Sequence, residues 1–309
     1  MIQSDLEHQV QRSPELLLLI PAGHISATLD PFAMTAIFAP PAQVNPNMVP
    51  DYEVSLLLDP DKVLTAAHEL TDSIRSAFDV KPHVTLVNVQ FLDTNDKEIY
   101  SSSWSARIRK FENQDKFELT YKRRYTIINS NVNAALNVAN EDGFNAAHTN
   151  YDAQVEWDFQ MKTLSISRKK KGLDAGIGNT NLPVESDSRQ MLIDEAPDKF
   201  DKWKPYKSQP NKWHPKPWGT SALKESRIFG PVRMSRFTGS WNGLKLYLEV
   251  WPLRNSTNTG IEYFVEASFK TDSETTASVE QSNLVAFLKS KNWLLQKGSS
   301  MTKLIMDRY

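Results

Sequence analysis

The sequence predicts a mainly β (α+β) protein built on one large antiparallel sheet, with a few helices on its apolar side. About nine segments are rich in β-branched and aromatic residues at strand spacing. In several of them charged and apolar residues alternate, which gives the sheet one charged and one apolar face. Nine strands are enough to close a barrel. A sheet with one wet face and a closed barrel with a charged interior are therefore both open at this point.

The predicted strands lie at residues 52–58, 85–92, 104–111, 116–124, 153–160, 163–167, 232–239, 244–251 and 261–270. After the first strand, Asp59 and Pro60 provide the N-cap and first turn of a helix that extends to about residue 78. A shorter helix is predicted at 131–142 and an amphipathic helix at 275–290. The apolar sides of these helices would cover the apolar face of the sheet.

Two segments differ in composition from the strand-rich remainder. Residues 1–50 are rich in proline and are predicted to form an arm that packs on the barrel. Residues 168–227 form an insertion that holds a basic run and the stretch KWKPYKSQPNKWHPKPWG. Its tryptophans and lysines have the composition of a single-strand nucleic-acid site. We favour a loop that packs on the barrel through its aromatic rings. If this loop also has a function, we expect it to be a lid over an active site.

Composition and charge exclude several classes of function. A formal net charge of −1 over 309 residues produces no global field for nucleic acid or an anionic membrane. The chain has no cysteine, which excludes disulfides and thiolate sites and fits the cytoplasm. It has no Walker, dinucleotide-binding, HExxH or GxSxG motif, and its histidines lack ligand spacing. We expect a cytoplasmic protein with a small-molecule substrate and no nucleic-acid or membrane partner; its oligomeric state is not predicted.

The charged faces of the strands hold side chains suited to an anion site with carboxylates nearby. Because residues two apart on a strand share a face, Arg107 and Arg109 project together, opposite Ala106 and Ile108. The same alternation sets further charged residues against apolar neighbours: Lys122, Arg124, Glu156, Glu249 and Glu266.

The stretch FLDTNDKEIYSSSWSARIRKFENQDKFELTYKRR, residues 91–124, resembles the central block of the CYTH superfamily, the triphosphate tunnel metalloenzymes. In that family an aromatic-x-Asp-Thr strand leads to an Arg-x-Arg strand and then to a Thr-x-Lys strand. FVEASFK and the SSMTKLIMDRY tail resemble the closing strand and C-terminus of the family. The resemblance implies a closed antiparallel barrel over residues 51–309, a tunnel with a charged interior and outer helices, interrupted by the insertion at 168–227.

The resemblance also implies roles for particular residues. Basic residues grip a polyphosphate in the family, and the matching residues here are Arg107, Arg109, Lys122, Arg236 and Lys303. Arg124 shares a face with Lys122 and is predicted to bind substrate with it. The acidic residues of the family hold a divalent metal and orient water, and Glu156, Glu249 and Glu266 match these.

Two diagnostic Glu-x-Glu pairs of the family are altered here. The first reads Glu53-Val-Ser55 and the second Glu266-Ala-Ser268, so each has lost one carboxylate. A hard cation such as magnesium needs several carboxylate ligands, and serine is a poor replacement. We therefore expect no metal or other cofactor, and Ser55 and Ser268 are predicted to be among the substrate-binding residues. The possible proton carriers are Glu53, Glu156, Glu249 and Glu266.

Three functional hypotheses follow from these residues. The first is an enzyme that binds a small anionic or polar-ended organic substrate and catalyses metal-independent chemistry of the cyclase, isomerase or pericyclase type. Such chemistry needs a shaped, dry cavity and polarising groups. The second is a divergent triphosphatase or phosphoryl-transfer enzyme that uses magnesium or manganese. The third is a non-catalytic anion-binding protein.

Overall fold

The described residues of the computed structural model are 45–205, 217–298 and 300–309. They belong to a unit, Val44–Tyr309, whose framework is a closed barrel of nine strands. The strands are β1 (Asp51–Leu58), β2 (Val84–Asp93), β3 (Trp104–Phe111), β4 (Lys116–Thr126), β5 (Asp152–Trp157), β6 (Lys162–Asp174), β7 (Arg227–Trp241), β8 (Leu244–Arg254) and β9 (Ile261–Thr271). The order around the barrel is β1-β5-β6-β4-β3-β2-β7-β8-β9, and β9 closes on β1.

The predicted closed barrel is confirmed, with one difference in strand direction. Strands β1 and β5 are parallel, with Asp51 opposite Gln154 and Val54 opposite Trp157, whereas the other neighbouring strands are antiparallel. β4 pairs with β6 rather than with β5, so β5 fills the gap between β6 and β1. Alternation within each strand cannot predict this order, because it defines faces and not neighbours.

The helices are α1 (Pro60–Val63), α2 (Asp72–Ala77), α3 (Glu98–Ser101), α4 (Val132–Glu141), α5 (Glu185–Asp194), α6 (Asp198–Asp201), α7 (Trp218–Lys224), α8 (Glu274–Ser290) and α9 (Met301–Arg308). The single helix predicted from Asp59 to residue 78 is wrong. Asp59 does cap α1, but the chain then turns through His68, whose φ is 59°, and Leu64 forms a bridge with Leu70 before α2 begins. The apolar residues of this segment are buried on one side of two short helices, which produces a spacing similar to that of a single helix.

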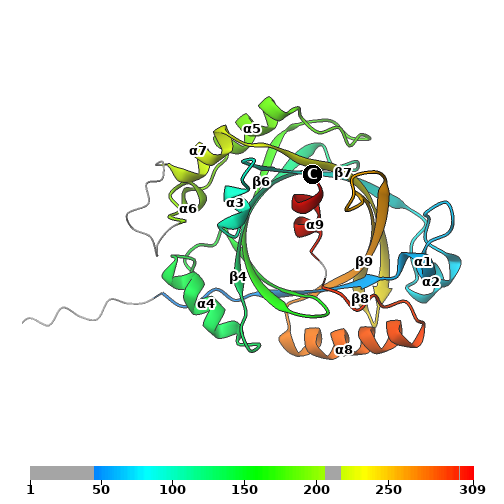
Figure 1. Ribbon diagram of the computed structural model, residues 1–309. Coiled ribbons are helices and arrows are strands. Elements are labelled where there is room, and N and C mark those ends of the chain that lie inside the picture. Colours follow the sequence, from blue (N-terminus) through cyan, green and yellow to red (C-terminus); the bar gives the residue numbers. More distant parts are fainter. Residues whose placement is uncertain (1–44, 206–216, 299) are drawn as a thin grey trace, which may run out of the picture. The chain divides into compact units, whose positions relative to one another are not determined.

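The main hydrophobic core lies between the barrel wall and the outer helices, as the alternation predicts. Trp104 on β3 is fully buried, and its ring lies 6.1 Å from that of Phe144 and 5.3 Å from that of Phe200. On the other side of the barrel, α8 packs on β1 and β9 (Figure 1). The outward-facing apolar residues are therefore core residues, and the charged residues face the barrel interior.

The predicted insertion at 168–227 begins with strand, because β6 continues to Asp174. Helices α5, α6 and α7 follow and pack on the outer face of the barrel. The Tyr121 hydroxyl donates to the Leu192 carbonyl, and the Gln90 amide donates to the Ser188 hydroxyl at 2.7 Å. Residues 206–216, which include the lysine-rich part of the predicted lid, lie outside the described residues.

The predicted N-terminal arm, residues 1–50, lies outside the described residues up to residue 44. Its last residues contact the segment around α4: the Asn140 amide donates to the Asn45 carbonyl at 2.8 Å, and Ala146 N donates to the Pro46 carbonyl at 3.0 Å. In the part of the chain that the structure describes, no helix is both long and apolar enough to cross a membrane.

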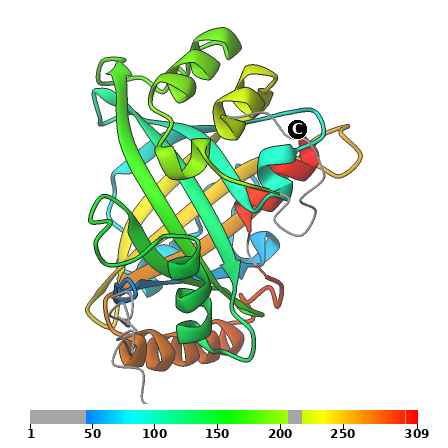
Figure 2. The same cartoon turned by 90° about the vertical axis from the view of Figure 1, so that its left-hand side faces the viewer.

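A second hydrophobic cluster lies inside the barrel, where α9 packs on inward-facing side chains of the wall. Met301, Ile305 and Met306 of α9 join the cluster, which also contains Phe91 and Trp251. Along the barrel axis α9 appears within the ring of strands, and the side view places its red ribbon toward one end (Figures 1 and 2). The interior is thus partly filled at this end, and the space that remains has both apolar and charged lining.

Candidate functional site

The barrel encloses a cavity of about 590 Å³, a volume typical of small-molecule sites. Its charged lining comes from inward-facing positions of eight strands: Asp51, Glu53, Arg107, Arg109, Glu118, Lys122, Arg124, Asp152, Glu156, Lys169, Arg236, Glu249, Glu266 and Lys270. The exposed members Asp51, Asp152, Lys169 and Lys270 lie toward the end at which β1 and β5 begin, so they mark a mouth of the cavity.

The first ion cluster joins β3 to β4. Arg109 Nε donates to the Glu118 carboxylate at 3.0 Å, and a second nitrogen of the same guanidinium contacts that oxygen. Arg107 lies farther from Glu118, at 3.7 Å, and donates to the Thr120 hydroxyl at 3.1 Å. Its buried Nε has no hydrogen-bond partner among the described residues. One carboxylate thus serves two guanidiniums, and Arg107 is the less tightly held of them.

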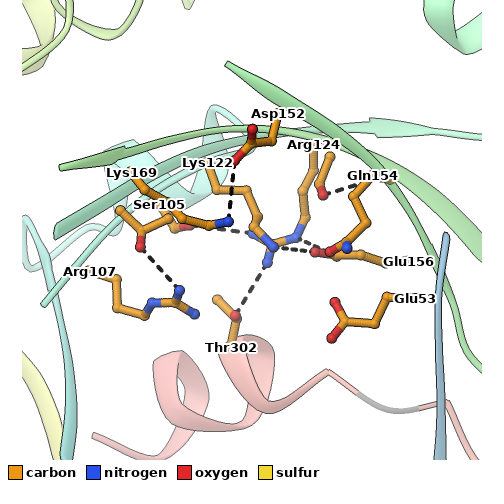
Figure 3. A network of polar contacts seen from close by, with 12 residues as sticks. Glu53, Ser105, Arg107, Lys122, Arg124, Asp152, Gln154, Glu156, Lys169 and Thr302 are labelled. Atoms are coloured by element: carbon orange, nitrogen blue, oxygen red, sulfur yellow. Dashed lines mark hydrogen bonds and ion pairs between the residues drawn. The ribbon is translucent and has the colours of Figure 1, made fainter. Parts of the chain in front are cut away.

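The second ion cluster is centred on Glu156 of β5. Lys122 and Arg124 of β4 both point to its carboxylate, Lys122 in direct contact and Arg124 Nε at 3.3 Å (Figure 3). The other Arg124 nitrogens donate at 3.4 Å to Thr302 of α9 and to Ser105 of β3. We call Arg107, Arg109, Lys122 and Arg124 the basic wall; Glu118 and Glu156 are the carboxylates paired with it.

Burial and ion pairing shift the pKa values of the side chains in these two clusters. Burial and, to a smaller extent, the neighbouring charge of Arg109 together lower the pKa of Arg107 to about 9. This value is still above neutral pH, so Arg107 remains protonated there. Burial alone would raise the pKa of Glu118, but Arg109 and Arg107 outweigh it and bring that pKa to about 2. Lys122 and Arg124 likewise hold the pKa of Glu156 well below its usual range, against the opposite effect of burial. Both carboxylates are therefore ionised at physiological pH.

The opposite side of the cavity carries most of the other carboxylates. Glu249 on β8 accepts from Arg236 Nε at 2.7 Å and from the Trp251 indole nitrogen at 3.1 Å. Glu266 on β9 lies directly opposite Glu249 in the sheet register. On β1, Glu53 lies 3.4 Å from Lys270 and accepts from the Gln154 amide at 2.7 Å in the amide orientation that satisfies both neighbours.

Apolar and aromatic side chains line the same cavity beside the charges. Phe91, Phe111 and Trp251 project from the wall, and Met301 and Ile305 of α9 complete the surface. The cavity can therefore hold a charged group and an apolar body at the same time.

The carboxylates in the cavity do not fit a divalent metal centre. Among the described residues, no group of three or more His, Cys, Asp or Glu side chains is placed to hold an ion. Glu156 is held by Lys122 and Arg124, and Glu249 is held by Arg236. A carboxylate whose charge is already compensated by a resident cation is a weak ligand for a hard metal.

Eleven of the twelve predicted site residues line this one cavity. The exception is Lys303, which is exposed on α9 and pairs with Asp307 one turn later. The helical spacing accounts for this difference, because Met301, Thr302 and Ile305 are the α9 residues that face the cavity. Thr302 was not predicted, since a helix that packs inside a barrel leaves no signal in the strand pattern.

Glu118 is the main residue that the sequence reasoning missed. It lies two residues before Thr120 and four before Lys122 on the inward face of β4, so the same alternation that selected Lys122 also contains Glu118.

We expect Glu118→Gln to lower the free energy of unfolding at pH 7 by about 3 kcal/mol, because it leaves two partly buried guanidiniums without their carboxylate. The folded pKa of Glu118 is depressed from 4.5 to about 2, so its stabilisation is present above pH 4.5 and is lost as the pH falls toward 2. Urea denaturation at pH 7 and pH 3 should show a smaller difference between the pH values for the variant than for the wild type. Glu141→Gln, at an exposed position on α4, is the control. Equal stability of Glu118→Gln and wild type at pH 7 would contradict the pairing.

No protein-family model and no curated protein matches the chain. Solved structures do match. HpAC1 from Hippeastrum, an adenylyl cyclase candidate with a dominant triphosphatase activity, is 15% identical with a TM-score of 0.45, over 82% of this chain and 94% of that chain. An adenylate cyclase candidate from Bacillus halodurans is 13% identical with a TM-score of 0.43, over 82% and 96% of the two chains. A protein from Pyrococcus horikoshii is 11% identical with a TM-score of 0.40, over 84% and 100%.

The barrel described above confirms the fold that the CYTH resemblance implies. The three structures are at most 15% identical to the chain and their TM-scores lie below 0.5, so no property of these proteins is carried over to it.

Proposed function

We propose that the protein is an enzyme that binds a small organic anion inside the barrel and catalyses a metal-independent reaction of the cyclase or isomerase type, pericyclic reactions included. One observation carries the proposal: the basic wall and an apolar surface line the same cavity. Among the residues that the structure describes, the four bases of this wall pair with two carboxylates, Glu118 and Glu156, so the basic wall has a net attraction for an anion.

In this proposal the basic wall binds the anionic end of the substrate. Arg107 has a buried nitrogen without a hydrogen-bond partner among the described residues, and Arg124 makes contacts of 3.3 to 3.4 Å that a ligand can replace. The apolar body of the substrate lies against Phe91, Phe111 and Trp251. Holding a flexible molecule in one conformation between these surfaces brings its reacting atoms together and lowers the entropic barrier of ring closure or rearrangement.

The carboxylates have different roles in this proposal. Glu156 stays ionised between Lys122 and Arg124, so it positions these bases and is a poor proton carrier. Glu266 lines the cavity on the opposite side, and we assign it the role of general acid or base. Glu249 and Glu53, which also line that side, are the next residues that could carry a proton.

A fluorescence titration tests the binding part of the proposal. The probe is 8-anilinonaphthalene-1-sulfonate, an aromatic anion, added to the wild-type protein in EDTA. We expect saturable binding, displaced by decanoate at lower concentration than by inorganic triphosphate. Binding of triphosphate that requires magnesium or manganese, together with its hydrolysis, would overturn the proposal in favour of a phosphoryl-transfer enzyme.

Mass spectrometry tests the catalytic part. The protein is incubated in EDTA with an extract of the source cells, and Glu266→Gln is incubated in parallel. Isomerisation and many ring closures leave the mass of the substrate unchanged. After incubation with the wild type, we therefore expect one compound to change its chromatographic retention time without a change in mass. The Glu266→Gln variant should not produce this change. A compound that binds and is recovered unchanged from the wild type would instead support a non-catalytic anion-binding protein.

A further inference from the structure

Helix α9 lies at the end of the barrel opposite the mouth. Arg308 of α9 contacts Glu262, near the start of β9, at 2.8 Å. Arg227, at the start of β7, donates to the Tyr309 carbonyl at 2.7 Å. Because β9 runs antiparallel to β1, the start of β9 lies at the end of the barrel where β1 finishes, whereas the mouth lies where β1 begins. The cavity therefore has a mouth at one end and α9 at the other.

Helix α9 contacts both kinds of surface that line the cavity. Its Thr302 hydroxyl accepts from Arg124 of the basic wall at 3.4 Å (Figure 3). Met301 and Ile305 are four residues apart, share a face of the helix and belong to the apolar cluster inside the barrel. Both residues are buried and yet line the cavity, so packing holds them in place behind the surface that they present. One helix thus fixes the apolar end of the cavity relative to the anion site.

The apolar lining suits an aliphatic chain. The Phe111 ring already has two cationic neighbours, since the guanidinium carbons of Arg109 and Arg236 lie 5.2 and 5.3 Å from its centre. The lining also includes aliphatic residues from β2 and α9: Val89, Met301 and Ile305. Methionine is flexible and adapts to the shape of its neighbours, so this surface can follow a chain with rotatable bonds.

We propose that α9 sets the length of the substrate: the substrate is an organic acid with an aliphatic chain, the basic wall binds the acid, and Met301 and Ile305 stop the far end of the chain. This inference rests on the proposed function, since the basic wall must first bind an anion. Each methylene group that leaves water for the apolar lining increases the affinity about fourfold. A chain that already reaches α9 can add a methylene only by displacing buried side chains, which costs more than the methylene contributes. The affinity should therefore pass through a maximum at one chain length.

A series of straight-chain alkanoates tests the proposal. The even-numbered acids from hexanoate to hexadecanoate, each below its critical micelle concentration, displace 8-anilinonaphthalene-1-sulfonate from the wild-type protein in EDTA. We expect the affinity to increase about 15-fold with each step of two carbons, as two buried methylene groups do. It should then fall for the acids that are too long for the space between the basic wall and α9.

Three variants test the role of α9 in the same assay. Met301→Ala removes the side chain beyond Cβ, so the maximum should move to an acid about two carbons longer. Met301→Leu nearly conserves the volume and should keep the wild-type maximum. The matched control is Leu288→Ala on α8, which removes the same number of non-hydrogen atoms from a buried residue of the main core, outside the barrel. It should lower the stability and leave the maximum where it is.

The outcomes separate this inference from the proposed function. An affinity that is independent of chain length, or that still rises at hexadecanoate, overturns the end wall and leaves the anion site standing. Absence of binding of all the alkanoates and of the fluorescent sulfonate overturns the proposed function itself. Because the chain-length series uses the wild-type protein, it holds even if Met301→Ala fails to fold. An unchanged maximum in a folded Met301→Ala variant contradicts the role assigned to Met301.

Discussion

Replacement of Arg107 by glutamine is expected to weaken binding of the aromatic sulfonate by about 30- to 150-fold, the effect of losing a charge-assisted contact of about 2 to 3 kcal/mol. The fold should be unaffected. Arg107 lies 3.7 Å from Glu118, and its buried Nε has no hydrogen-bond partner among the described residues. Burial and Arg109 both lower its pKa, so its charge is costly in the absence of a ligand. Fluorescence titration measures the binding, and urea denaturation measures the stability.

Two further variants give this experiment its controls. Arg233→Gln removes an exposed arginine of β7 that does not line the cavity, and should leave binding and stability unchanged. Arg109→Gln should weaken binding and also destabilise the protein, because Arg109 makes the direct contacts with Glu118. Normal binding by Arg107→Gln would show that the basic wall is not an anion site. Loss of binding by Arg233→Gln would show that the probe reports net charge and not the cavity.

The sequence predicts which side chains of each strand point into the barrel. Apolar and charged residues alternate along a half-buried strand because one of its faces must pack on the core. Arg107 and Arg109 project into the cavity because Ala106 and Ile108, which alternate with them along β3, are buried under the outer helices. The same constraint placed Lys122 and Arg124. A one-residue slip would expose an apolar row and bury a charged one, so these side chains have one stable facing.

Other features depend on contacts that no local pattern records. The parallel pairing of β1 with β5 is set by the order in which strands close the barrel. The position of α9 inside the barrel depends on the match of Met301 and Ile305 to Phe91 and Trp251, residues far apart in the sequence. The similarity of the SSMTKLIMDRY tail to the family predicts Lys303 as a site residue. The direction of its side chain, however, is set by its position around α9.

Two serines of the cavity lining offer a test of why the described carboxylates do not form a divalent metal site. Ser55 and Ser268 lie directly opposite each other on β1 and β9, and both line the cavity. Glu53 precedes Ser55 by two residues, and Glu266 precedes Ser268 by two residues, on the same inward faces. Carboxylates at positions 55 and 268 would therefore join Glu53, Glu249 and Glu266 in one patch that has several oxygen ligands for a hard cation.

We expect the double variant Ser55→Glu with Ser268→Glu to bind magnesium or manganese with a dissociation constant on the order of 0.1 to 1 mM, the range of modest carboxylate sites. Without metal the variant should be less stable than the wild type, because two like charges then lie directly opposite each other in the sheet. Thermal denaturation should show a lowered midpoint in EDTA that recovers as the metal is added, by mass action on the folded state.

The matched control is Ser55→Gln with Ser268→Gln, which adds the same volume without charge and should show no metal-dependent midpoint. A wild-type midpoint that rises with magnesium as steeply as that of the glutamate variant would contradict our conclusion that the resident carboxylates do not fit a metal. Recovery in the glutamate variant alone would show that the barrel geometry still suits a divalent ion and that two hydroxyls in place of two carboxylates prevent its binding. The absence of a metal response in the wild type would then be caused by the side chains at positions 55 and 268, and the ion pairs of Glu156 and Glu249 would contribute less to it.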